Sequence, residues 1–127
     1  MSDALTIGKK LVALCREGRN YDAVKTLYDQ NVVSIEPFSD DQMPGRLQGL
    51  DAVIGKHDWW YANNTTHGGT VEGPFPHGER FVVYFVMDIT PKHGPSAGQR
   101  TTFKEAGLYT VKNGKIVQEE WFYDMPG

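Results

Sequence analysis

The sequence contains a single cysteine, Cys15, so no disulfide can form within the chain. It also has no basic excess: the formal net charge is −3 at pH 7. Without surplus positive charge there is little counterion release to drive binding to nucleic acid, and we expect no such partner. The longest apolar run, 81–87, is far too short to cross a bilayer. No secretory signal stands at the N-terminus. We therefore expect a cytoplasmic protein without a membrane partner.

Several motifs of catalysis and cofactor binding are also missing. There is no G-x-S-x-G elbow, no phosphate-binding Gly-Lys-Ser/Thr loop and no dinucleotide fingerprint. The four histidines are scattered rather than set at metal-ligand spacing. The sequence therefore predicts no cofactor and no metal.

What is present is enough apolar sequence for one folded domain, which we expect to span 1–127. Hydrophobic residues make up 39% of the 127 and aromatic residues 12%. Apolar residues recur at helical spacing in the first part of the chain, which predicts helices at about 5–15, 21–28 and 50–62. The period changes to two near residue 65. Strands are predicted at 31–36, 66–75, 80–90, 100–111 and 115–124, with a polar loop at 38–49. Helices followed by antiparallel strands indicate an α+β fold.

The last predicted hairpin turns at Asn113-Gly114, and two turns can close it. A two-residue turn would pair Lys112 with Lys115, whereas a three-residue turn would pair Val111 with Lys115. We favour the three-residue turn, because we expect only this turn to place the aromatic and apolar residues of both strands on one inner face. These sets are Phe103, Glu105, Gly107, Tyr109 and Val111, and Val117, Glu119, Trp121 and Tyr123.

Two carboxyl groups, Glu105 and Glu119, then point inward among aromatic side chains. Burial raises a carboxyl pKa, as a general acid or base requires. If Glu36 joins them, at least one of the three should be protonated near neutral pH, because like charges cannot all ionise cheaply together.

The opposite face of the 80–90 strand carries Val82, Tyr84 and Val86. Three such residues are not expected to remain in water on a small protein, so we predict a homodimer through the outer face of the sheet.

Four stretches in this order resemble the nuclear transport factor 2-like superfamily, and most closely its SnoaL-like polyketide cyclase branch. They are Tyr21-Asp22-Ala23-Val24 through Leu27-Tyr28, Val33-Ser34-Ile35-Glu36-Pro37, Gly49-Leu50-Asp51-Ala52-Val53, and Tyr109 through Val117. The resemblance implies a cone-shaped fold in which three N-terminal helices pack on a strongly curved, mostly antiparallel sheet. It also implies an apolar pocket. Members include isomerases, cyclases, dehydratases, epoxide hydrolases and non-catalytic binding domains.

The resemblance can be carried over at a few positions. In ketosteroid isomerases an Asp before a Pro ends the first strand and is the general base, and Glu36 precedes Pro37 here. The isomerase's oxyanion-hole Tyr on the first helix has no counterpart, since Val12 lies near that position. Related cyclases keep an Asp on the inner face of the last strand, where this chain has Trp121.

We therefore predict a small cofactor-free enzyme that moves protons next to a carbonyl group, as in isomerisation, cyclisation or dehydration. Glu36 and Glu105 are the predicted acid and base, acting on a small apolar or aromatic, polyketide-like ligand. The predicted substrate-binding residues are His57, Trp60, Phe85, Tyr109, Glu119 and Trp121. Four alternatives stay open: Glu36 is a strand-end carboxylate bonded to a backbone amide or solvated, Glu105 is salt-bridged and structural, His57 is a hydrogen-bonded core residue, and the tryptophans only fill the core. The rival function is a non-catalytic ligand-binding or interaction domain.

Overall fold

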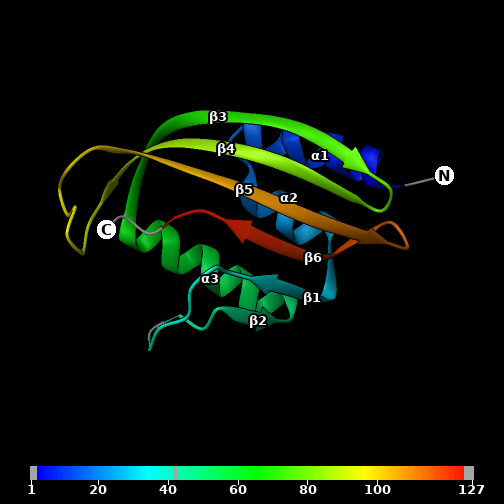
Figure 1. Ribbon diagram of the computed structural model, residues 1–127, viewed down its shortest axis with the longest axis horizontal. Coiled ribbons are helices and arrows are strands. Elements are labelled where there is room, and N and C mark those ends of the chain that lie inside the picture. Colours follow the sequence, from blue (N-terminus) through cyan, green and yellow to red (C-terminus); the bar gives the residue numbers. More distant parts are fainter. Residues whose placement is uncertain (1–2, 42, 125–127) are drawn as a thin grey trace.

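A computed structural model describes residues 3–41 and 43–124 (Figure 1). Two helices, α1 (Ala4–Arg16) and α2 (Asn20–Leu27), lead into the first strand, β1 (Tyr28–Ile35). A short strand, β2 (Arg46–Gln48), precedes the helix α3 (Leu50–Asn63). Four strands follow, namely β3 (Asn64–His77), β4 (Arg80–Pro91), β5 (Thr101–Lys112) and β6 (Lys115–Phe122).

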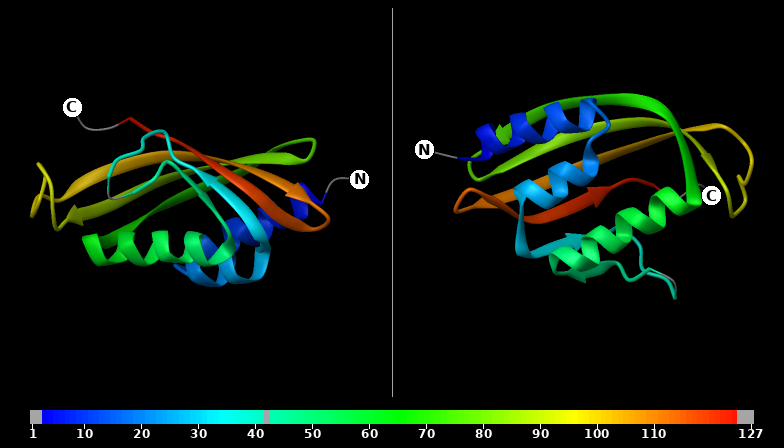
Figure 2. Two further views of the ribbon diagram at one scale, coloured as in Figure 1. Left: turned by 90° about the horizontal axis from the view of Figure 1, so that it is seen from below. Right: turned by 180° about the vertical axis from the view of Figure 1, so that it is seen from behind.

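The strands form one six-stranded curled sheet in the order β2-β1-β6-β5-β4-β3. Every neighbouring pair is antiparallel except β1 and β6, which run parallel. The three helices lie on the same face of this sheet, as the view from below shows (Figure 2). The predicted α+β fold, with three helices on a curved and mostly antiparallel sheet, is confirmed.

Hydrophobic burial explains why the helices adopt these positions. The buried residues of α1 include Ile7, Leu11 and Val12, at the i, i+4 and i+5 positions of one helical face. They belong to one core cluster with Phe81 and Tyr109 of the sheet, whose rings stack with centroids 4.9 Å apart. The core thus occupies the concave side of the sheet, and the outer side of β4 carries no helix (Figure 2).

The predicted polar loop at 38–49 contains a strand that the sequence reading missed. Residues 46–48 form β2 and pair with β1, with Leu47 opposite Ser34. Three residues are too few to show an alternating pattern, so β2 depends on the edge of β1 that it pairs with.

The predicted three-residue turn of the last hairpin was wrong. Lys112 pairs with Lys115, and Asn113 and Gly114 have φ values of 52° and 76°, as a two-residue type I′ turn requires. A bulge follows directly, because the register shifts between Thr110 and Val111.

That bulge shifts the register by one residue, so the aromatic residues of β5 and β6 still lie on the same face of the sheet, as predicted. Tyr109 stands opposite Glu119 and Gly107 opposite Trp121, so the aromatic sets do share the inner side. One residue of the predicted inner set was wrong. Next to the turn, Ile116 is fully buried, whereas the predicted Val117 is only partly buried.

Within residues 3–41 and 43–124, no helix has both the length and the apolar character needed to cross a membrane.

Candidate functional site

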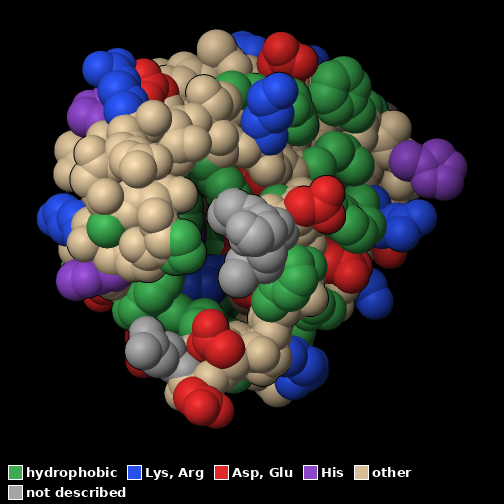
Figure 3. Space-filling view, turned by 60° about the vertical axis from the view of Figure 1, so that its left-hand side comes forward, with side chains coloured by type: hydrophobic (Ala, Val, Ile, Leu, Met, Phe, Trp, Pro, Cys, Tyr) green, Lys and Arg blue, Asp and Glu red, His purple; other side chains and the backbone are tan. Residues whose placement is uncertain are grey.

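A cavity of about 330 Å³ lies between the helices and the concave face of the sheet. This volume falls at the lower end of the range for small-molecule sites. Figure 3 shows a recess between hydrophobic side chains on the surface. Aromatic rings supply much of the wall, and the residues concerned are Tyr28, Phe38, Trp59, Trp60, Tyr61, Phe85, Phe103, Tyr109, Trp121 and Tyr123.

Glu119 on β6 is the most enclosed charged group of the site, with an exposed fraction of 0%. Its carboxylate accepts hydrogen bonds from the Tyr28 hydroxyl, from Ser34 Oγ at 2.6 Å and from Trp121 Nε1 at 3.0 Å. Burial by itself raises the pKa of Glu119. The charge of Lys56 and these hydrogen bonds outweigh burial and hold the pKa below its usual value. Glu119 is therefore a carboxylate at neutral pH.

Lys56 on α3 connects this buried carboxylate to the rest of the site. Its ammonium lies 2.5 Å from Ser34 Oγ, 2.9 Å from Glu36 Oε2 and 3.2 Å from Glu119 Oε2. Burial lowers the pKa of Lys56, but the two carboxylates more than compensate and raise it above the usual value. Lys56 is thus a charged residue whose three N–H donors are all used.

Glu36 follows the last residue of β1 and turns its carboxylate into the cavity wall. Lys56 donates to Oε2, and the Tyr123 hydroxyl donates to Oε1 at 2.6 Å. Its backbone N–H also donates to Gly45 O at 2.6 Å, which holds the chain just after β1. Each carboxylate oxygen therefore accepts one hydrogen bond and retains a free lone pair.

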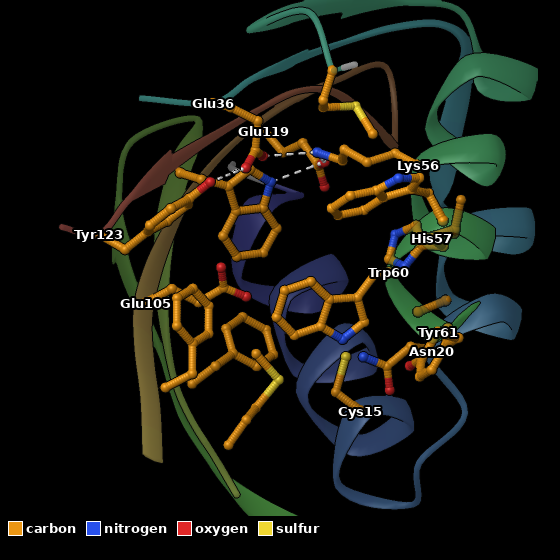
Figure 4. A pocket seen from close by; sticks show the side chains of 18 of the residues that line it. Cys15, Asn20, Glu36, Lys56, His57, Trp60, Tyr61, Glu105, Glu119 and Tyr123 are labelled. Carbon is orange, nitrogen blue, oxygen red and sulfur yellow. Dashed lines mark hydrogen bonds and ion pairs between the residues drawn. The ribbon is translucent and has the colours of Figure 1, made fainter. Parts of the chain in front are cut away.

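Glu105 on β5 has a different environment. It stands opposite Phe85 in the sheet, and Figure 4 shows its carboxyl group directed into the cavity toward Trp60. No other described residue gives it a hydrogen bond or an ion pair. Burial, followed by the negative charges of Glu36 and Glu119, raises the pKa of Glu105 to about 8. Glu105 is therefore a neutral carboxylic acid at pH 7, and it forms no salt bridge with any described residue.

Aromatic contacts fix the wall around Glu105. The ring centroids of Phe85 and Trp121 are 5.7 Å apart, and those of Tyr109 and Trp121 are 5.9 Å apart in an edge-to-face arrangement. Trp60 and Phe103 approach to 5.5 Å. The indole of Trp121 is held further by its hydrogen bond to Glu119. The aromatic rings of the cavity wall therefore pack against one another and make it largely apolar.

His57 on α3 also lines the cavity, one turn of helix before Tyr61. Burial lowers its pKa, so its ring is neutral at pH 7. Its Nε2 is enclosed and has no hydrogen-bond partner among the described residues. The alternative prediction of a hydrogen-bonded core histidine therefore has no support at Nε2.

All eight residues singled out from the sequence line this one cavity: Glu36, His57, Trp60, Phe85, Glu105, Tyr109, Glu119 and Trp121. The sequence reading missed Lys56, Ser34 and Tyr28. A signal for Lys56 was available in the sequence, because it lies three residues after Val53 and four residues before Trp60 and therefore on the same helical face. Ser34 and Tyr28 offered no signal, since their partner Glu119 is more than 80 residues away in sequence.

No three His, Cys, Asp or Glu side chains of the described ranges gather where they could hold a metal ion. A hydrogen-bond network instead joins Lys56, Glu36 and Glu119 with Ser34, Tyr28, Tyr123 and Trp121. Figure 4 shows the Glu105 carboxyl group apart from Glu36, Glu119 and Lys56.

A curled sheet enclosing an apolar, carboxyl-bearing cavity with three helices defines a protein of the nuclear transport factor 2-like fold. Residues 3–123 match the SnoaL-like domain family, and the chain belongs to that family. A protein from Mesorhizobium loti, provisionally named a SnoaL-like polyketide cyclase, is 37% identical with a TM-score of 0.85; the match covers 93% of this chain and 97% of that one.

Two more distant structures share the fold. A protein of unknown function from Burkholderia pseudomallei, described as NTF2-like, has a TM-score of 0.77 at 20% identity over 98% of this chain and 92% of that one. A protein from Bacillus subtilis, provisionally named an isomerase, has a TM-score of 0.67 at 17% identity over 96% of this chain and 86% of that one. A comparison with curated proteins gives no match.

Proposed function

We propose that this protein is an acid–base catalyst that moves protons next to the carbonyl group of a small, largely apolar or aromatic molecule. One observation carries the proposal: a carboxylate, Glu36, and a neutral carboxylic acid, Glu105, line the same cavity. One carboxyl group is held by a lysine and a tyrosine, and the other is buried without a partner among the described residues, and such a difference in environment is the usual basis for assigning a base and an acid. The provisional name of the Mesorhizobium loti relative, a polyketide cyclase, agrees with a carbonyl-bearing substrate.

In this mechanism a free lone pair of Glu36 takes a proton from the carbon next to the carbonyl. The electrons of the broken C–H bond form the carbon–carbon double bond of an enol, and the carbonyl oxygen receives the proton of Glu105. Where a neighbouring carbon–carbon double bond extends the enol to a dienol, Glu36 delivers its proton to the far carbon and the Glu105 carboxylate takes back the hydroxyl proton, which completes an isomerisation. Placement of a proton donor where negative charge develops typically contributes 10²–10⁴-fold to the rate. The chain's own residues suffice for these steps.

Trp60 and Trp121 would hold a flat substrate between the two carboxyl groups. Lys56 and Tyr123 position Glu36 through its two oxygens, at 2.9 and 2.6 Å. We further propose a cytoplasmic homodimer, on the basis of the single cysteine and of the outward-facing Val82, Tyr84 and Val86 of β4.

A non-catalytic ligand-binding domain is the second candidate, and a specific observation favours it. Both oxygens of Glu36 already accept a hydrogen bond, one of them from a charged ammonium. A substrate proton would therefore have to compete with the Lys56 ammonium and the Tyr123 hydroxyl for the oxygens of Glu36.

Hydrogen–deuterium exchange separates the two functions. 2-Tetralone, a flat ketone with exchangeable protons beside its carbonyl, is incubated with the protein in D₂O and followed by NMR. The catalyst is expected to exchange these protons faster than buffer alone, and Glu36→Gln and Glu105→Gln should each lose about 10²–10⁴-fold of that rate. Glu120→Gln is the control, because Glu120 follows Glu119 on β6 and its side chain points to the opposite face of the sheet. It should leave the rate unchanged. Binding of 2-tetralone without exchange above the buffer rate would support the binding domain.

A further inference from the structure

The charges in the cavity do not balance. Four carboxyl groups, those of Glu36, Asp40, Glu105 and Glu119, line it together with one lysine, Lys56. Lys56 contacts two of them, at 2.9 and 3.2 Å, and its remaining donor goes to Ser34. No donor of Lys56 is left for Glu105, and no other described residue pairs with it. When Glu105 ionises, the cavity therefore contains a carboxylate without a partner.

The wall around Glu105 is made of aromatic rings. Phe85 stands directly opposite it in the sheet, and Figure 4 shows the Trp60 indole across the cavity from its carboxyl group. The ring of Trp121 lies against both Phe85 and Tyr109. The faces of aromatic rings carry partial negative charge and attract cations, most strongly when water is excluded. An unpaired carboxyl group within such rings is the arrangement that binds organic ammonium groups.

We propose that the cavity binds organic cations, such as quaternary ammonium groups on an aromatic or aliphatic body, and that such a ligand pairs with Glu105 after its proton has left for solvent. The bound cation then balances the charge of the Glu105 carboxylate. It also removes the acidic proton on which the proposed function depends, so organic cations inhibit that reaction competitively. The inference shares with the proposed function only the premise that ligands enter this cavity.

Other titratable groups face the same cavity from each neighbouring element. They are Cys15 of α1, Tyr28 of β1, Glu36 and Asp40 of the following loop, Lys56 and His57 of α3, Tyr61 near the end of α3, Tyr109 of β5, Glu119 of β6, and Tyr123 after β6. The pKa values of the tyrosines are raised above 10, that of Cys15 is raised to about 12, and that of Lys56 is raised above 10.5. The pKa values of His57 and Glu119 are lowered. Among these shifted groups, Glu105 alone changes charge between pH 7 and 9.

The test uses two molecules of the same shape and different charge. Phenyltrimethylammonium is a permanent cation, and tert-butylbenzene is its neutral counterpart, so neither titrates. Binding of each is measured by quenching of tryptophan fluorescence at pH 6, 7, 8 and 9. We expect the affinity for the cation to rise about tenfold per pH unit up to about pH 8 and then to level, because only the ionised form of Glu105 is competent. The affinity for tert-butylbenzene should not rise.

Two further measurements identify the group responsible. In Glu105→Gln the affinity for the cation should lose its pH dependence, while tert-butylbenzene should bind within twofold of the wild type. In the wild type at pH 7, calorimetry in buffers of different ionisation enthalpy should record release of about one proton per cation bound. This second measurement stands even if the variant fails to fold.

Three results would overturn the inference: the cation binds no more tightly at pH 9 than at pH 6, its pH dependence persists in Glu105→Gln, or neither molecule binds. Tight cation binding combined with no deuterium exchange of 2-tetralone would instead support the inference while contradicting the proposed catalysis. Exchange of 2-tetralone that is unaffected by phenyltrimethylammonium would contradict the inference and leave the catalysis in place.

Discussion

The ammonium of Lys56 on α3 lies 2.9 Å from the carboxylate of Glu36, which follows β1. The two side chains are only 14% and 15% exposed, so this ion pair is largely shielded from water. It connects a helix to the end of a strand across the rim of the cavity. The proposed base is therefore positioned by tertiary contact rather than by its own strand.

Replacing Lys56 with Met should destabilise the fold by about 3–5 kcal/mol at pH 7, because Glu36 and Glu119 would be left without their cation. Glu119 has a lowered pKa in the folded protein, so its contribution to stability is present above the unfolded-state pKa and is lost as the pH falls through the folded value. The destabilisation should accordingly be smaller at pH 4 than at pH 7. Urea unfolding at the two pH values measures both.

Lys104→Met is the matched control for that variant, since Lys104 lies exposed on β5. It should change the free energy of unfolding by less than about 0.5 kcal/mol. An equal loss for Lys56→Met at pH 4 and pH 7 would show that packing of the lysine stem, and not its charge, is the main contribution.

Glu105→Gln should make the protein more stable at alkaline pH. The pKa of Glu105 is about 8 in the folded protein and 4.5 in the reference state, so between these values the folded state holds a proton that the unfolded state lacks. Stability from this group is complete below pH 4.5, falls as the pH rises, and is constant again above about 8. The glutamine removes this fall. We expect the free energy of unfolding of Glu105→Gln, measured relative to the wild type, to be roughly 3–5 kcal/mol higher at pH 9 than at pH 5.

Urea denaturation of wild type and Glu105→Gln at pH 5, 7 and 9 tests this expectation. Glu120→Gln, at the alternate position on β6, should follow the wild-type pH dependence. If wild type and Glu105→Gln show parallel curves from pH 5 to 9, Glu105 is ionised throughout and its role as an acid is refuted.

Gly107 on β5 leaves the space that Trp121 occupies. A Cβ atom at this position would lie 2.9 Å from Trp121 Cζ3 and 2.9 Å from Tyr109 Cε2. Gly107→Ala should therefore destabilise the protein by about 1–3 kcal/mol and shift the Trp121 ring in the cavity wall. Gly55→Ala on α3 is the control, because a Cβ there meets nothing within 4 Å.

The control should stabilise the protein by about 0.5–1 kcal/mol through helix propensity. Thermal unfolding measures both variants, and near-ultraviolet circular dichroism reports the environment of the tryptophan. A Gly107→Ala protein with unchanged stability and spectrum would mean that the wall yields easily.

The outer face of the sheet should form a dimer interface through Val82, Tyr84 and Val86. Tyr84→Glu would place a charge in that interface and should weaken association at least tenfold. Sedimentation at micromolar concentration is the measurement. A single wild-type species of 14.3 kDa would contradict the prediction.

The sequence by itself determined the elements and the faces they bury. Hydrophobic period is a local property, so the change from helical to alternating spacing near residue 65 predicted the order of helices and the four later strands. It also predicted that Glu105 and Glu119 share an aromatic face, although the turn that produces this arrangement was wrong. The bulge between Thr110 and Val111 compensated for the two-residue turn, and burial of the aromatic set fixes that register.

Only the tertiary structure decided what each carboxyl group does. Glu36, Glu105 and Glu119 look equivalent in sequence, but Lys56 contacts Glu36 and Glu119 and does not contact Glu105. Lys56 lies 20 residues from Glu36 and 63 from Glu119 in the chain, and no local pattern specifies that pairing. The curled sheet brings α3 against β1, and from α3 the Lys56 side chain also reaches Glu119 on β6. Among the described residues, Glu105 on β5 has no cation partner. Burial without a partner makes Glu105 a neutral acid, because the free energy of a charge in a protein depends on its surroundings in space.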